Sequence, residues 1–251
     1  MEPQNTGPGP LAGIRVLEIA SMILGPLAGQ YLGDLGADVI KLEPPEGDLT
    51  RSIGPRRSPL MGSFFLSSNR SKRSIVVDLK KAEGQAILRS LLKDTDVLLH
   101  SLRTPAANKL GLDYETLKQI KPSIVYCHVT GYSDEGAYAG RPAYDDIGQA
   151  ASGLAQLQTA VAGQPRFMPS IFADKIGALH ASIGMLAAIT HRTATGQGQQ
   201  VEVVTRYGVV LACGGFPHDI LRRQQLFPHT TTGHEHFTPS PKANTGDGLR
   251  M

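Results

Sequence analysis

The sequence contains no tryptophan, few aromatic residues (6%) and only two cysteines in its 251 residues. Cys127 and Cys213 are far apart and form no C-x-x-C motif, which excludes a disulfide-stapled fold and predicts a reducing, cytoplasmic location. No segment approaches the run of about 20 apolar residues that a membrane span needs, so no membrane contact is expected. Residues 1–10 are polar, lack the apolar core of a signal peptide and are expected to be flexible.

The net charge is also small, at +3, which is too little to indicate a nucleic-acid partner. The basic residues are nevertheless clustered, at Arg56-Arg57 and in residues 69–73 (NRSKR). Such runs either form a solvated surface or bind an anionic, phosphorylated ligand, and the sequence leaves both interpretations open.

Several catalytic motifs are missing. G-x-S-x-G, H-E-x-x-H and G-x-x-x-x-G-K-[ST] do not occur, which excludes the nucleophile elbow, the zinc-protease helix and the P-loop. His229, His234 and His236 lie in an aperiodic tail and make a weak metal pattern, so no metal is expected. His100 and His128 are interpreted as structural residues.

What is present is an alternation of strand and helix patterns. Short β-rich apolar runs predict strands at 14–20, 38–42, 74–78, 97–99, 124–129 and 200–204. Helical spacing predicts helices beginning near Pro26, and at 82–93, 114–120, 145–157 and 174–192, with a long loop over 43–70. The pattern indicates an α/β fold with an open, parallel, Rossmann-like sheet and helices on both faces.

A parallel sheet binds ligands at the carboxyl ends of its strands, and two candidates lie there. After the first strand, residues 21–29 do not match G-x-G-x-x-G, although Glu43 ends the second strand where a ribose-binding acid would lie, so a dinucleotide site is the weaker hypothesis. Asp174 follows an apolar run and begins a helix. It is interpreted as an N-cap, as an ionised nucleophile, or as both, since a helix N-terminus keeps a carboxylate charged.

Five ordered segments resemble the class III CoA-transferases (the CaiB/BaiF family). They are residues 11–18 (LAGIRVLE) with Gly25-Pro26 and 35–43 (LGADVIKLE), residues 69–74 (NRSKRS) with 78–80 (DLK), Tyr144-Asp145 with Gln149-Ala150 and Ser152-Gly153, residues 173–175 (ADK), and 195–199 (TGQGQ) with 201–203 (VEV). The family includes formyl-CoA transferase and carnitine CoA-transferase, and α-methylacyl-CoA racemase is a relative. The matches extend from Leu11 to about Val204.

The resemblance implies that Asp174 is the catalytic nucleophile. Its carboxylate would attack the thioester carbonyl of an acyl-CoA, giving a mixed aspartyl-acyl anhydride and free CoA thiolate, from which CoA passes to an acceptor carboxylate. Acyl-CoA and a small carboxylic acid are then the substrates, with no permanently bound cofactor. The family's CoA contacts fall on fourteen residues of this sequence: Ile23, Leu24, Val77, Asp78, Leu79, Lys80, Ser101, Leu102, Arg103, Lys109, Arg141, Pro142, Ala143 and Tyr144.

Three departures from the family pattern bear on this interpretation. His100-Ser101-Leu102 replaces the Glu-Asn-Phe found in much of the family, and Tyr144 replaces the racemase histidine, which favours transfer over racemisation. Family members are also longer, with a second domain, and pair as interlocked homodimers. We therefore expect a flexible segment at 1–10, a CoA-binding domain at 11–228 and a linker at 229–251. A racemase-like enzyme and a truncated CoA-binding protein without turnover are the alternatives.

Overall fold

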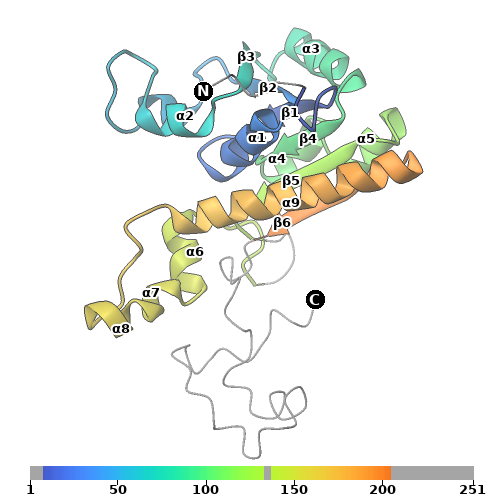
Figure 1. The fold of residues 1–251 in the computed structure, drawn as a ribbon. Coiled ribbons are helices and arrows are strands. Elements are labelled where there is room, and N and C mark those ends of the chain that lie inside the picture. Colours follow the sequence, from blue (N-terminus) through green and yellow to red (C-terminus); the bar gives the residue numbers. More distant parts are fainter. Residues whose placement is uncertain (1–7, 133–136, 205–251) are drawn as a thin grey trace, which may run out of the picture. The chain divides into compact units, whose positions relative to one another are not determined.

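The computed structural model describes residues 8–132 and 137–204, and Figure 1 shows how their helices and strands are arranged. The chain divides into two compact units. Described residues of the first are 8–132, 137–141 and 174–204, and those of the second are 142–173. Residues 1–7 of the expected flexible segment 1–10 lie outside the described residues, as do the expected linker at 229–251 and His229, His234 and His236 within it.

The first unit is built on one six-stranded sheet in which every neighbouring pair is parallel. The strand order is β3-β2-β1-β4-β5-β6, the doubly wound order of a Rossmann-like fold, which confirms the predicted fold class. The strands are β1 (Arg15–Ile19), β2 (Asp38–Glu43), β3 (Lys72–Val76), β4 (Val97–His100), β5 (Val125–Thr130) and β6 (Gln200–Val204).

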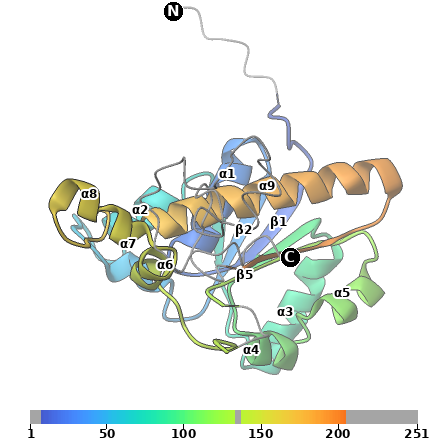
Figure 2. The same ribbon diagram turned by 90° about the horizontal axis from the view of Figure 1, so that it is seen from below.

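Helices cover both faces of this sheet (Figure 2). On one face lie α1 (Leu24–Asp34) and α9 (Phe172–Thr195), and on the other lie α3 (Ala82–Lys93), α4 (Thr104–Lys109) and α5 (Tyr114–Ile120). An apolar core joins the second face to its helices through residues such as Leu17, Leu88 and Leu117. Burial of these side chains is the main favourable term in folding.

Helix α9 is long and apolar enough, by length and composition alone, to cross a membrane. Its buried residues, among them Ala178, Ala181 and Met185, identify it instead as a core helix that packs on the sheet. The contact is close, because a Cβ added at Gly184 would lie 2.7 Å from Val201 Cγ1.

Three of the segments that differ from the sequence prediction show why. The third strand is Lys72–Val76 rather than 74–78, because Lys72 pairs with Val39 in the register with β2. The single helix expected at 145–157 is broken into α6 (Asp145–Ala151) and α7 (Leu154–Leu157), because Gly153 takes a left-handed conformation (φ 79°) that ends a helix. The predicted loop at 43–70 contains the 3-10 helix η1 (Leu49–Ser52) and α2 (Ser63–Ser68).

The second unit holds α6, α7 and α8 (Thr159–Ala162). The buried Gln149 side chain joins α6 to the segment that precedes α9. Its Oε1 accepts from the Met168 backbone N–H at 2.7 Å, and its Nε2 donates to the Ser170 carbonyl at 3.0 Å. This glutamine fixes the course of the chain before Asp174.

Candidate functional site

The strand order reverses between β1 and β4, which is where doubly wound sheets bind ligands. The loops that follow these two strands are joined directly. The Ser21 backbone N–H donates to Ser101 Oγ at 3.2 Å, and the Ser101 N–H donates to the Ile19 carbonyl at 3.3 Å. The fold thus brings two of the predicted CoA-contact segments, Ile23-Leu24 and Ser101-Leu102, to the same edge of the sheet.

The first of these segments is a tight turn between β1 and α1, residues 20–26, which we call the β1–α1 turn. Met22 has a φ of 67°, a left-handed conformation that is rare outside glycine and persists only where its surroundings hold it. The Ile23 side chain is buried and Leu24 is half-buried. A ligand at this turn would therefore contact Ile23 through its backbone.

Asp174 lies in the first turn of α9, as its third residue. The helix begins at Phe172, so the prediction that Asp174 is the N-cap is wrong. The apolar residues Phe172 and Ala173, with nothing polar to stop the helix, extend it backwards by two positions. The electrostatic part of the argument is unaffected, because amides of the first turn lack intrahelical partners and favour a carboxylate beside them.

Helix α9 approaches the β1–α1 turn one helical turn beyond Asp174. A Cβ added at Gly177 would lie 2.6 Å from Leu24 Cδ1, so the start of α1 contacts α9 at this glycine. Residues three apart share one face of a helix, which puts Asp174 on the same side of α9 as Gly177. The candidate nucleophile and a predicted CoA-contact residue are thus close neighbours.

The segment after β3 is held mainly by its backbone. Val77 is buried and its N–H donates to the Glu43 carbonyl at 2.9 Å. The Asp78 side chain accepts from the Lys80 N–H at 3.0 Å, and Leu79 packs against the core. Lys80 itself is exposed, so its ammonium group is available to a phosphate.

The segment after β4 presents Arg103 and Lys109, which are both exposed. Arg103 precedes α4 and Lys109 ends it, so these two residues are about 9 Å apart along the helix. The Leu102 carbonyl oxygen is held by a hydrogen-bond contact with His128 of β5, whose Nε2 lies 2.9 Å away.

His100 and His128 stack with ring centroids 4.5 Å apart, and His100 Nε2 lies 2.7 Å from the Tyr126 hydroxyl. Burial, reinforced by His128, lowers the pKa of His100 to about 3, so its ring is neutral near pH 7. Both histidines have a structural role near the carboxyl ends of β4 and β5, in line with their interpretation from the sequence.

The remaining predicted contacts, residues 141–144, lie where the sequence passes from the first unit to the second. The Arg141 guanidinium lies 5.3 Å from the centroid of the Tyr138 ring, a cation–π contact. Pro142, Ala143 and Tyr144 belong to the second unit, where Tyr144 is 64% exposed and precedes α6.

The basic cluster at 69–73 is paired within the chain. Arg70 and Arg73 form exposed ion pairs with Asp34 and Asp38, whereas the side chain of Lys72 is only 2% exposed. These ion pairs favour a structural role for the cluster, and the buried Lys72 does not reach a surface ligand. Arg56 and Arg57 are exposed on the loop before α2.

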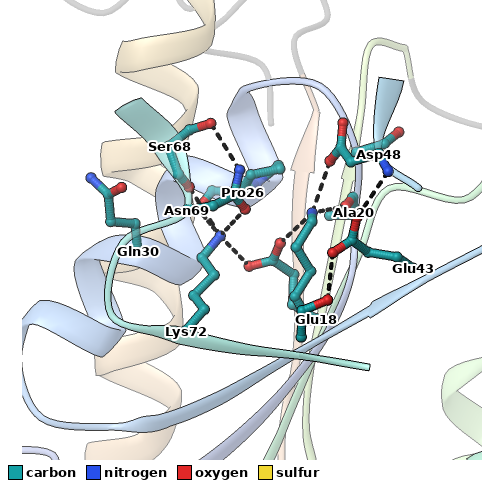
Figure 3. A network of polar contacts seen from close by, with 12 residues as sticks. Glu18, Ala20, Pro26, Gln30, Glu43, Asp48, Ser68, Asn69 and Lys72 are labelled. Carbon is teal, nitrogen blue, oxygen red and sulfur yellow. Dashed lines mark hydrogen bonds and ion pairs between the residues drawn. The ribbon is translucent and has the colours of Figure 1, made fainter. Parts of the chain in front are cut away.

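Sequence reasoning missed a buried ion cluster beneath the β1–α1 turn (Figure 3). Its core is Glu18, whose carboxylate lies 2.9 Å from Lys41 Nζ and 2.8 Å from Lys72 Nζ. Burial opposes the charge on Lys41, but Glu18 and Asp48 raise its pKa above the ordinary value. A signal was present: Glu18 and Lys41 are charged residues inside apolar strands, and they pair in the β1–β2 register.

Glu43 is also held inside the protein rather than facing a ribose. Its carboxylate accepts two hydrogen bonds from Arg51 at 2.7 Å, one from Ser74 Oγ at 2.6 Å and one from the Asp48 N–H at 2.9 Å. Burial opposes its ionisation, yet these donors lower the pKa of Glu43 to about 2. The dinucleotide hypothesis thereby loses its acidic residue.

The described residues contain no cluster of possible metal ligands. Within residues 8–132 and 137–204, no group of three histidine, cysteine, aspartate or glutamate side chains is placed to hold an ion.

Comparison with known proteins identifies the family. A family-wide sequence profile described as "CoA-transferase family III" matches residues 11–249. The chain belongs to this family. Among curated relatives, succinate–glutarate CoA-transferase of Agrobacterium fabrum is 36% identical over 96% of this chain and 62% of its own length. Formyl-CoA:oxalate CoA-transferase of Streptomyces coelicolor is 35% identical over 87% of this chain and 52% of its own length.

Solved structures agree with this assignment. A CAIB/BAIF family protein from Brucella suis has a TM-score of 0.79 at 34% identity, over 88% of this chain and 59% of that one. The chain thus spans between half and two thirds of the length of the family members that it matches.

Proposed function

We propose that this chain carries the CoA-binding and nucleophile-bearing part of a CoA-transferase that moves CoA between an acyl-CoA thioester and a carboxylic acid. The observation that carries the proposal is the position of Asp174, one helical turn from the contact between Gly177 and Leu24, at the edge where β1 and β4 end. A carboxylate at a helix N-terminus stays ionised and can act as a nucleophile.

The chemistry follows in balanced steps. An Asp174 carboxylate oxygen attacks the thioester carbonyl, the carbon–sulfur bond breaks, and CoA leaves as its thiolate, leaving a mixed aspartyl-acyl anhydride. The CoA thiolate attacks the aspartyl carbonyl of this anhydride, the bond to the acyl-bearing oxygen breaks, and the donor acid leaves as its carboxylate, so that CoA is held as an aspartyl thioester. The acceptor carboxylate attacks that thioester and expels the thiolate, which forms a second anhydride. Attack of the thiolate on the acceptor's own acyl carbonyl then gives the product thioester and returns the Asp174 carboxylate. Covalent catalysis of this kind divides one hard exchange into easier steps.

The CoA itself would lie along the sheet edge. Backbone groups of Ile23, Leu24, Ser101 and Leu102 would contact it, and the exposed cations Lys80, Arg103 and Lys109 would pair with its phosphates. Val77, Asp78 and Leu79 would support Lys80, while Arg141, Pro142, Ala143 and Tyr144 would complete the contacts. A domain at 11–228, a linker at 229–251, a cytoplasmic location and a homodimer complete the proposal.

A half-reaction tests this function without knowledge of the acceptor. Anhydride formation is reversible, so labelled CoA should enter the acyl-CoA pool when the chain is incubated with succinyl-CoA or formyl-CoA. We expect Asp174→Asn to slow this exchange by about 10³-fold or more, because the nucleophile is gone. The control is Asp146→Asn, a change at an exposed aspartate of α6.

The two outcomes are distinct. Exchange that depends on Asp174 and not on Asp146 supports the proposal. Exchange by Asp174→Asn at the parent rate, with the folded state intact by circular dichroism, contradicts it.

A further inference from the structure

Two buried lysines hold the two ends of the β1–α1 turn. Lys41 Nζ donates to the Ala20 carbonyl at 2.7 Å, where β1 ends. Lys72 Nζ donates to the Pro26 carbonyl at 2.6 Å, in the first turn of α1. Between these two fixed carbonyls lie residues 21–25, which include the left-handed Met22.

Both lysines are held by the same carboxylate. Glu18 is fully buried, and its two oxygens each face one of the ammonium groups. In Figure 3, Glu18 lies between the Lys72 side and the Asp48 side of the cluster. The three residues come from β1, β2 and β3, so the arrangement follows from the parallel order of these strands.

The remaining partners complete each ammonium group. Lys41 also pairs with Asp48 at 2.9 Å, and Lys72 also donates to the Ser68 carbonyl at 3.0 Å and to Asn69 Oδ1 at 2.8 Å. Two lysines are balanced by two carboxylates. Because Lys41 and Lys72 are only 1% and 2% exposed, neither ammonium group reaches the surface to bind a phosphate.

Stability alone is a poor reason for such a cluster. Replacing a buried ion pair by neutral side chains of similar shape is often neutral or stabilising, because desolvation offsets the attraction between the charges. What apolar side chains do not supply is a donor to the Ala20 and Pro26 carbonyls at the two ends of the turn. A left-handed non-glycine residue such as Met22 also needs surroundings that impose its conformation.

We propose that Lys41 and Lys72 are positioning residues for coenzyme A, which fix the backbone of the β1–α1 turn in the shape that binds it. The proposal rests on the CoA site proposed above. A fixed β1–α1 turn holds Leu24 against Gly177 of α9. It would thereby set the distance between the bound thioester and Asp174. A preformed turn binds its ligand without the cost of ordering it.

The test removes charge in pairs, so that no buried charge is left alone. Glu18→Gln/Lys72→Met removes the ammonium group at Pro26, and Lys41→Met/Asp48→Asn removes the one at Ala20. The control is Arg73→Gln, at the neighbouring position on β3, where the ion pair with Asp38 is exposed. Each 251-residue variant is studied by urea unfolding, by hydrogen exchange of residues 21–27, and by calorimetric titration with coenzyme A.

We expect the paired variants to keep a cooperative unfolding transition. Amide exchange in residues 21–27 should accelerate by about tenfold or more, and the affinity for coenzyme A should fall by about tenfold, the effect of one lost charged hydrogen bond. Exchange elsewhere in the sheet and the behaviour of Arg73→Gln should match the parent chain.

Each contrary result is decisive. A folded paired variant with parental exchange in the turn and parental affinity shows that the lysines have no positioning role. If neither paired variant folds, the cluster is required for the fold itself, and the proposal is overturned. If the parent chain does not bind coenzyme A, the proposed CoA site is contradicted. Amide exchange in residues 21–27 then still shows whether Lys41 and Lys72 hold the turn in place.

Discussion

Acid unfolding should depend strongly on Glu43. This carboxyl group has a pKa of about 2 in the folded chain against 4.5 when free. Because the folded pKa is depressed, its stabilising contribution is complete above about pH 4.5 and is lost as the pH falls towards 2. The shift corresponds to about 3 kcal/mol, which we reduce to about 2 kcal/mol because solvent partly screens Arg51, its main partner.

The variant Glu43→Gln keeps the shape and removes the charge. Urea unfolding of the parent and the variant should differ by about 2 kcal/mol near pH 7. With a folded pKa of about 2, the difference should shrink to about two fifths of this near pH 3 and continue to fall towards pH 2. Asp38 and Asp96 also have lowered pKa values, but they titrate in both chains and cancel in the comparison. Glu46→Gln, at an exposed position three residues on, should change little at either pH. A difference for Glu43→Gln that is the same at both pH values would refute the assigned cause.

Two further predictions concern buried positions, one in helix α1 and one in strand β5. Gly29→Ala in α1 should lower the unfolding free energy by about 2 kcal/mol or more in urea titrations, because the added Cβ would lie 2.0 Å from Glu18 Oε2. The same change in an open helix stabilises by about 1 kcal/mol. A variant more stable than the parent would therefore contradict the position of Glu18. Burial raises the pKa of the Cys127 thiol to about 12. In a Cys213→Ser variant, the folded chain should therefore not react with a thiol reagent near pH 8 until urea is added. Rapid labelling of the folded variant would show that Cys127 is not buried.

The strands were predictable because their chemistry is local. Five of the six strands lie within about one residue of their predicted positions, since buried parallel strands are uninterrupted apolar runs. The edge strand β3 is the exception. Its ladder includes Lys72 and Arg73, whose side chains are held by Glu18 of β1 and Asp38 of β2, and no local pattern shows those partners.

The candidate site was predictable in its parts and less so in its connections. A resemblance pointed to Asp174 and to the segments after β1 and β4, and the sheet brings these last two together. The contact between Gly177 and Leu24 joins residues more than 150 positions apart, which spacing along the chain cannot reveal. The same holds for Lys72 and Pro26, because their hydrogen bond depends on the order of three strands.

The most direct measurement of the role of Asp174 is to trap the acyl-enzyme. The 251-residue chain is mixed with an acyl-CoA, treated with hydroxylamine, digested and examined by mass spectrometry. An anhydride on this carboxylate predicts a hydroxamate on the peptide that contains Asp174, present in the parent and in Asp146→Asn and missing from Asp174→Asn. Rapid exchange of CoA by the parent chain, with the hydroxamate on another residue or on none, would contradict the proposed mechanism.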